Sequence, residues 1–130
     1  HSIDYLLIGG YAVGFYGYPR STLDIDVWVN TEQENARKLV VMLKEFGFDV
    51  DGLSEQLFTT PGNVVRMGVP PVRIQILTRI SGAEFEECHP NRVTARIDGI
   101  AVPLIGLKDL KKNKLASGRH KDLDDLDNLP

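Results

Sequence analysis

Short apolar runs alternate with polar turns along most of the chain, a pattern that predicts a β-sheet with helices packed against it. Side chains in a strand alternate between its two faces, whereas a helix gathers its apolar residues in one stripe. Asp98-Gly99 lies between the last two runs and is a strong two-residue hairpin signal. The predicted strands span residues 4–8, 23–29, 64–69, 72–78, 93–97 and 100–104.

Helical patterning begins after the second predicted strand. Thr31 and Glu34 match a capping box, and the apolar spacing that follows predicts a helix of about four turns. This helix would end at Gly47 and cover one face of the sheet. Ser81 with Glu84 predicts the start of a shorter helix farther along the chain.

Size and charge narrow the class of protein. At 130 residues and 42% hydrophobic composition, the chain is expected to form one globular domain with a modest core. The net charge is −3 and the isoelectric point is about 5.6, so the chain lacks the overall basic field of a non-specific nucleic-acid binder. Cys88 is the single cysteine, which excludes an internal disulfide and a cysteine-rich zinc site.

The expected compartment follows from what the sequence lacks. No stretch reaches the roughly 18 apolar residues of a membrane span, and no signal peptide is visible. A soluble, cytoplasmic protein with no membrane partner is therefore expected. His1-Ser2 stands in place of a starting methionine, and a strand is predicted almost at once, so the natural protein is expected to extend farther at its N-terminus.

Two aspartates in the second predicted strand are the first candidates for chemistry. Asp24 and Asp26 are two positions apart within an apolar run, so both carboxylates should project from the same face of the strand. Two like charges held side by side call for a cation between them. Mg²⁺ (or Mn²⁺) commonly joins one or two carboxylates to substrate phosphates, so the pair predicts a metal site.

A glycine pair follows the first predicted strand and leads into a short predicted helix. Gly9 and Gly10 would let the backbone approach a bound phosphate closely. The loop before the aspartates contains Arg20, Ser21 and Thr22. Their guanidinium and two hydroxyls would serve to bind the same phosphate-bearing ligand, a nucleotide. The alternatives are that the glycines form only a tight turn, that the two aspartates are solvated, and that Arg20 pairs with one of them.

These residues resemble a known family. The run LLIGGYAVGFYGYPRSTLDIDVWV, residues 6–29, looks like the signature of the DNA polymerase β-like nucleotidyltransferase superfamily. Within it, the chain is similar to minimal nucleotidyltransferases of bacteria and archaea and to the nucleotidyltransferase toxins of abortive-infection systems. The run KLASGRHKDLDDLDNL, residues 114–129, resembles the C-terminal segment of the same group.

The resemblance implies a fold and an activity. The fold would be the nucleotidyltransferase fold, an α/β (α+β) architecture with a mixed, twisted sheet flanked by helices. The activity would be metal-dependent transfer of a nucleoside monophosphate from a nucleoside triphosphate to a hydroxyl of an RNA or protein acceptor, with a cognate toxin or antitoxin as an expected partner. Gly9 and Gly10 would meet the phosphates, Asp24 and Asp26 would hold the metal, and Lys114 would neutralise the triphosphate.

One position departs from the family pattern. Active members usually carry a third carboxylate on a later strand, and Gln75 stands at the corresponding place, on the same face as Arg73 and Leu77. A carboxamide can coordinate through its oxygen, but it cannot accept the proton of an acceptor hydroxyl. Candidate replacements elsewhere in the sequence are Glu84, Glu86, Glu87, Asp49 and Asp51.

A predicted helix at residues 106–117, with Gly118 as its cap, carries lysines on its apolar stripe. Lys114 lies between two leucines in projection, and we expect it to face the nucleotide. Lys111 is equally compatible with phosphate binding and with a side chain that packs its stem on the core and reaches water. The acids that follow are expected on the solvated face of another helix, with Leu123, Leu126 and Leu129 inward.

Two classes of function remain open. The first is an enzyme, a nucleotidyltransferase in a toxin–antitoxin or phage-defence system. The second is a catalytically impaired module that keeps the nucleotide cleft but has lost turnover with the change at Gln75. Other catalytic patterns are missing from the sequence, among them the G-x-S-x-G elbow and the P-loop motif.

Overall fold

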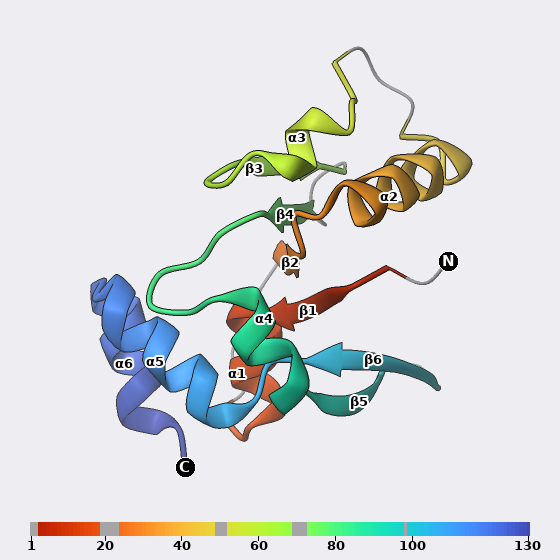
Figure 1. Cartoon of the computed structure of the whole chain (residues 1–130). Helices are drawn as coiled ribbons and strands as arrows, with labels where there is room; N and C mark the ends of the chain where they lie inside the picture. Colours follow the sequence, from red (N-terminus) through yellow and green to blue (C-terminus); the bar gives the residue numbers. More distant parts are fainter. Residues whose placement is uncertain (1–2, 19–23, 49–51, 69–72, 98) are drawn as a thin grey trace.

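A computed structural model describes residues 3–18, 24–48, 52–68, 73–97 and 99–130. Within these ranges the chain forms a six-stranded sheet with the order β3-β4-β2-β1-β6-β5 (Figure 1). The strands are β1 (Tyr5–Ile8), β2 (Asp24–Val29), β3 (Val64–Met67), β4 (Arg73–Leu77), β5 (Val93–Ile97) and β6 (Ile100–Leu104).

The sheet is mixed. The central strand β2 pairs antiparallel with β1 and parallel with β4, and β1 pairs parallel with β6 on its other side. The two outer pairs, β3 with β4 and β5 with β6, are antiparallel. The second of these pairs is the predicted hairpin, so that prediction is confirmed.

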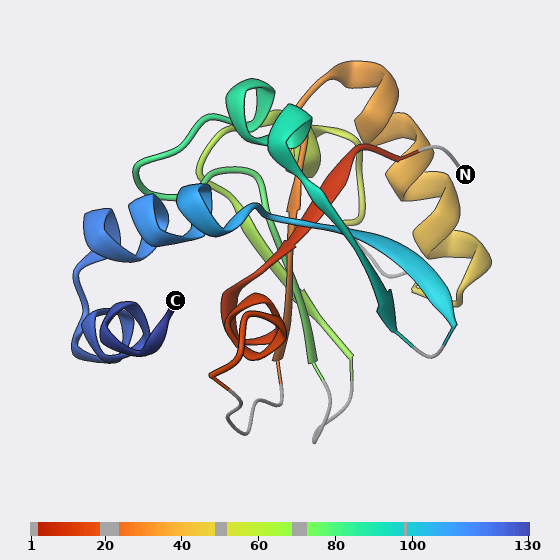
Figure 2. The same ribbon diagram turned by 90° about the horizontal axis from the view of Figure 1, so that it is seen from below.

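Helices lie on both faces of the sheet. Figure 2 shows α2 on one side, whereas α5 and α6 lie on the other, and the mixed sheet flanked by helices confirms the predicted α+β class. Among the described residues, no helix is long and apolar enough to cross a bilayer. The helices are α1 (Gly9–Phe15), α2 (Gln33–Glu45), α3 (Gln56–Thr59), α4 (Phe85–Cys88), α5 (Leu107–Ser117) and α6 (His120–Asn128), with a 3-10 turn, η1 (His89–Asn91), after α4.

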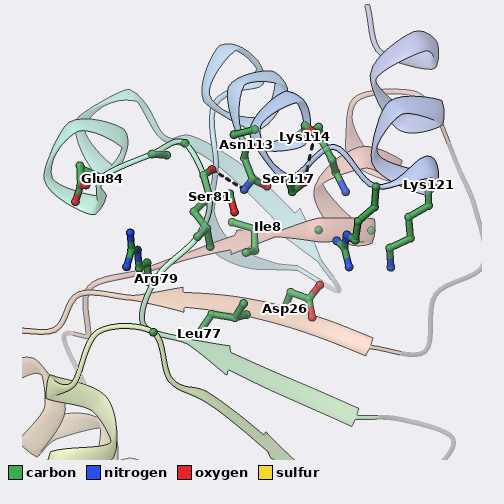
Figure 3. A pocket seen from close by; sticks show the side chains of 18 of the residues that line it. Ile8, Asp26, Leu77, Arg79, Ser81, Glu84, Asn113, Lys114, Ser117 and Lys121 are labelled. Carbon is green, nitrogen blue, oxygen red and sulfur yellow. Dashed lines mark hydrogen bonds between the residues drawn. The ribbon is translucent and has the colours of Figure 1, made fainter.

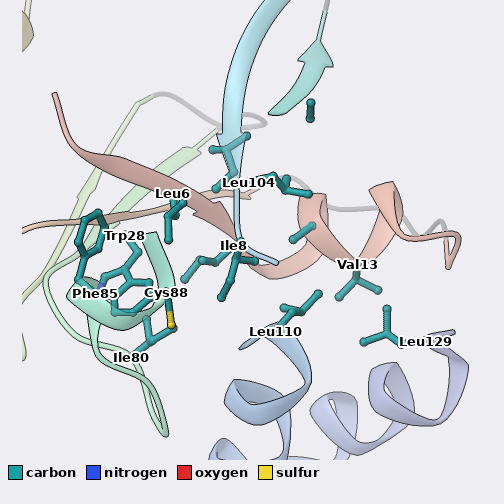
Figure 4. Close-up of a cluster of buried hydrophobic side chains, with 14 residues drawn as sticks. Leu6, Ile8, Val13, Trp28, Ile80, Phe85, Cys88, Leu104, Leu110 and Leu129 are labelled. Carbon is teal, nitrogen blue, oxygen red and sulfur yellow. The ribbon is translucent and has the colours of Figure 1, made fainter. Parts of the chain in front are cut away.

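Two hydrophobic clusters fill the space between the layers. One lies under α2 and α3, where Phe58 and Ile76 are buried among the leucines of α2. The other joins β1, β2 and β6 to α1, α4 and α5 (Figure 4). Trp28 is buried there and meets Phe85 edge to face, with ring centroids 5.2 Å apart. Such aromatic pairs add about 0.5–1.5 kcal/mol beyond the area they bury. This cluster anchors the strand that carries the two candidate aspartates.

Two predicted helix starts are wrong in detail. The helix α2 has Glu32 at its N-cap with no side-chain cap, so Thr31 and Glu34 form no capping box. Asn30 precedes the helix, and its Oδ1 accepts a hydrogen bond from the Glu32 amide at 2.8 Å. The short helix α4 begins at Phe85 rather than at Ser81, because the chain first makes a bridge between Ile80 and Ala83.

The last helix also differs from the prediction. Asp122 and Asp125 are fully buried, whereas Leu123 is 41% exposed, so the expected solvated acidic face is wrong for these two acids. Both carboxylates lie against Lys114 of α5, whose ammonium is 3.2 Å from Asp122 Oδ1 and 3.0 Å from Asp125 Oδ2. A lysine buried on one helix therefore turns the acidic side of the next helix inward.

Candidate functional site

The two candidate aspartates lie at the start of β2, between the first strand and β4. Asp26 is opposite Ile8 in the antiparallel ladder, and Ile8 immediately precedes Gly9 in the chain. In the parallel ladder, Asp24 is opposite Arg73 and Asp26 is opposite Gln75. Because side chains along a strand alternate between its faces, the two carboxylates of β2 share one face, as the sequence predicts, and paired positions place Arg73 and Gln75 on that face too.

Gly9 lies directly against the Asp26 carboxylate. Its φ of +66° places it in the left-handed region, where a side chain is disfavoured. A Cβ built on Gly9 would lie 2.3 Å from Asp26 Oδ2, far inside contact distance. A residue without a side chain is therefore required at the point where the backbone passes the acid, for reasons of both conformation and space.

Substitution of Gly9 with alanine should displace the Asp26 carboxylate and weaken divalent-cation binding. We expect a loss of about 10–100-fold in Mn²⁺ affinity, the range seen when a group that orients a metal ligand is changed. Gly14→Ala is the matched control, because it lies on the same helix and its Cβ would meet nothing within 4 Å. Calorimetric titration with Mn²⁺ checks both variants. Equal Mn²⁺ affinity in Gly9→Ala and the native chain would contradict this role.

A cleft of about 790 Å³ opens beside these residues (Figure 3). The end of β1, the aspartate strand, the segment after β4 and the C-terminal helices α5 and α6 all contribute to its walls. In Figure 3, Asp26 lies below the two helices, and the Lys121 side chain extends from α6 over the same space. The polar and charged lining side chains are Asp26, Arg79, Ser81, Glu84, Glu87, Asn113, Lys114, Ser117, Arg119 and Lys121.

The electrostatic setting of Asp26 favours a cation. Burial raises the pKa of the Asp26 carboxyl above its usual value, and the neighbouring charge of Asp24 raises this pKa further. Lys121, Lys114 and Arg119 offset part of this shift, so all three cations lie close enough to act on the carboxylate. A cation bound at Asp26 would relieve the remaining cost of keeping it ionised.

The donor set fits a divalent ion that is shared with a ligand. Asp26 Oδ1 is buried and has no hydrogen-bond partner among the described residues, as expected of an oxygen that has a ligand to meet. Within the same described ranges, no group of three or more acidic, histidine or cysteine side chains is placed to hold a metal. Two carboxylates with phosphate oxygens and water meet the needs of Mg²⁺, which keeps several waters.

Gln75 lies at the site, as its position in the sequence predicts. Its Nε2 donates a hydrogen bond to Asp24 Oδ2 at 3.1 Å. Since a carboxylate only accepts, the amide nitrogen must face Asp24, and the amide oxygen is turned elsewhere. Among the candidate replacements for a third carboxylate, Glu84 and Glu87 line the same cleft. Asp49 and Asp51 lie outside the described residues.

The two candidate lysines of α5 have different surroundings. Lys114 lines the cleft, but it is 3% exposed and its charge is balanced by the two buried aspartates of the last helix. Lys111 does not line the cleft, and its ammonium donates to the carbonyl of Pro130. The loop candidates Arg20, Ser21 and Thr22 lie outside the described residues.

Three basic cleft residues were not assigned a role from the sequence. Arg79 lies two residues after the end of β4, and Arg119 and Lys121 flank the first residue of the last helix. The signal for the last two was present in the Gly-Arg and Lys-Asp segment of residues 114–129, in which only Lys114 was assigned a role. Arg79 carried no local signal, because only the folded chain brings the end of β4 beside the C-terminal helices.

Comparison with known proteins supports the architecture. No protein-family model matches the chain, and no curated protein matches its sequence. Among solved structures, a Thermotoga maritima protein described as a "putative nucleotidyltransferase" is similar, with a TM-score of 0.62 and 16% sequence identity. The match covers 98% of this chain and 81% of that protein. At this identity the likeness concerns the fold, and the predicted nucleotidyltransferase fold is confirmed.

Proposed function

We propose that this chain transfers a nucleoside monophosphate from a nucleoside triphosphate to a hydroxyl group of an RNA or protein acceptor, with a divalent cation bound at Asp24 and Asp26. The observation that carries the proposal is the Asp26 carboxylate. It has one buried oxygen without a hydrogen-bond partner among the described residues, and it lies at a cleft whose opposite wall is basic. The similarity in fold to the Thermotoga maritima protein described as a "putative nucleotidyltransferase" supports the same function.

In this reaction the acceptor oxygen forms a bond to the α-phosphorus, and the bond from that phosphorus to the β-phosphate oxygen breaks. The electron pair leaves with pyrophosphate, and the proton of the hydroxyl passes to a base or to water. A bound Mg²⁺ would neutralise phosphate charge at the moment when negative charge builds up on the leaving group.

The protein's own residues position the reactants. Gly9 and Gly10 keep the floor of the cleft free of side chains beside Asp26. Lys121 and Arg119 supply positive charge on the opposite wall, where a triphosphate of high negative charge would be held in place. Positioning and charge complementarity provide most of the rate enhancement in phosphoryl transfer.

A labelled-transfer assay tests this function. The protein is incubated with each α-phosphate-labelled triphosphate together with cellular RNA and protein. The acceptor that becomes labelled, and the triphosphate that labels it, identify the acceptor and the preferred base. Label should appear with Mg²⁺ and disappear with EDTA. Lys121→Gln should weaken triphosphate binding, whereas Lys108→Gln, on the exposed surface of α5, should not. Absence of label from every acceptor, together with absence of triphosphate binding, would overturn the proposal.

A second candidate function has one observation in its favour. Gln75 donates to Asp24 where a carboxylate would provide a base, so the chain could bind a nucleotide and hold it without turnover. Tight triphosphate binding without label transfer would select this reading. A role in a toxin–antitoxin or phage-defence pair depends on the sequence resemblance, and growth arrest that requires Asp26 upon expression tests that role.

A further inference from the structure

Asp24 is engaged by the neighbouring strand in a way that Asp26 is not. Arg73 Nε lies 3.3 Å from Asp24 Oδ1, and Gln75 Nε2 donates to Asp24 Oδ2 at 3.1 Å. Each oxygen of this carboxylate therefore lies near a nitrogen of β4, Oδ1 in an ion pair and Oδ2 in a hydrogen bond. Arg73 and Asp24 are both partly exposed, with 51% and 32% of their side-chain areas accessible, so the ion pair forms at the open edge of the site.

The parallel pairing of β2 with β4 produces this arrangement. Asp24 is paired with Arg73 and Asp26 with Gln75, and the two-residue period of both strands puts all four side chains on one face. A guanidinium is therefore fixed by the backbone register beside one of the two carboxylates. Its charge is permanent, because arginine does not lose its proton in proteins.

Asp26 has the opposite character. It lines the cleft, its Oδ1 has no hydrogen-bond partner among the described residues, and Gly9 leaves space at its Oδ2. The carboxylate that lines the cleft thus has no ion pair among the described residues, although Lys121, Lys114 and Arg119 act on it through space. The carboxylate that already has a cation is on the side of β4.

Two-metal sites of phosphoryl transfer place their ions about 3.5–4 Å apart, where they act on both the attacking and the leaving oxygens. Such ions need carboxylates to offset their mutual repulsion. Here the two aspartates provide two negative charges, Gln75 provides none, and Arg73 already offsets one of them. A second dication on the β4 side would meet a guanidinium in place of an acid.

We propose that this site binds a single divalent cation, with Asp26 as the main ligand and Asp24 as a second. Arg73 supplies the second fixed positive charge, on the acceptor side. The inference rests on the proposed function, since it concerns the same carboxylate pair. Gln75 acts here as a positioning residue, because its hydrogen bond orients Asp24 toward Arg73. If one ion binds, the fraction of chains that hold metal should rise in proportion to the free metal concentration below saturation.

Counting bound ions tests this proposal without any assay of turnover. The intact chain is titrated with Mn²⁺ alone, and unbound Mn²⁺ is measured from its electron paramagnetic resonance signal. We expect one Mn²⁺ per chain. Asp127→Asn, an exposed acid of α6, should leave the count unchanged, and Asp26→Asn should abolish binding.

Variants of β4 should change the count in a defined direction. The double variant Arg73→Gln with Gln75→Glu exchanges the guanidinium for a neutral group and adds a carboxylate, so we expect it to bind two Mn²⁺ ions. Arg73→Lys keeps the charge and should still bind one. Circular dichroism checks that each variant is folded.

Each other result is informative. Two ions of similar affinity in the native chain would overturn the single-cation proposal and leave the proposed function standing. A count of one in the folded double variant would also overturn it, because Arg73 would then not exclude the second ion. No binding of Mn²⁺ to the native chain would overturn both proposals.

Discussion

Replacement of Lys114 by methionine is expected to lower the free energy of unfolding by about 3–5 kcal/mol, the scale of removing one partner from a buried ion pair. Asp122 and Asp125 are fully buried, and the Lys114 ammonium lies within 3.2 Å of both. Without it, these buried carboxylates lose the ammonium that they share, although Asp122 keeps Arg119. The total free energy of unfolding of a domain of this size is only about 5–15 kcal/mol.

Urea denaturation at neutral pH measures this effect. Lys108→Met is the matched control, because it removes an exposed lysine from the same helix and should change stability by less than about 0.5 kcal/mol. A triple variant that also carries Asp122→Asn and Asp125→Asn should recover part of the loss, since it removes both negative charges from the interior. A Lys114→Met variant as stable as the native chain would show that the ion cluster is not what holds α6 in place.

The same cluster predicts a dependence on pH. Burial opposes ionisation of Asp122, but hydrogen bonds from Arg119, Ser117 and Lys114 outweigh it and hold the pKa of this carboxyl well below its usual range. A depressed pKa contributes stability that is present above the unfolded value and is lost as pH falls toward the folded value. The stability difference between the native chain and Lys114→Met should therefore shrink below a pH of about 4.

Asp26→Asn is expected to separate stability from function. The loss of the carboxylate should reduce nucleotidyl transfer by about 10²–10³-fold, the scale on which one electrostatic element of a transition state acts. In EDTA, however, the variant should be more stable than the native chain. Burial and Asp24 raise the pKa of Asp26, so its ionised form at neutral pH disfavours the folded state, and asparagine removes that cost.

Thermal unfolding with and without Mn²⁺ checks this reversal. At a concentration of 100 times the dissociation constant, a bound ion adds about 2.7 kcal/mol to the native chain and nothing to a variant that does not bind it. We therefore expect the order of stability to change sign between EDTA and saturating Mn²⁺. A variant less stable than the native chain in EDTA would show that Asp26 serves the fold rather than a ligand.

Local patterns predicted most of the elements that position the site. The alternation around Asp24 and Asp26 gave the correct face, because a strand's period of two is fixed by its backbone. The hairpin at residues 93–104 followed from its two-residue turn. The face of Gln75 was also predicted, although its hydrogen bond to Asp24 requires the parallel register that joins two strands nearly fifty residues apart.

The partners of buried charges were not predictable in the same way. Helical spacing placed Lys114 on an apolar stripe, and this residue is indeed buried. Its two acidic partners belong to the next helix, where their spacing matches that of a solvated face. Whether these acids are buried or exposed depends on how the two helices pack together, and the sequence of one helix does not determine that packing. Arg79 was missed for the same reason.

Two opposite sides of the cleft come from segments far apart in the chain. Gly9 and Asp26 form the acidic side, whereas Arg119 and Lys121 form the basic side more than ninety residues later. During synthesis on the ribosome, a nascent chain that has emerged only as far as β4 can pair its aspartate strand but has no basic wall. If the chain transfers nucleotides as proposed, its triphosphate site would be complete only after α5 and α6 have docked against the sheet.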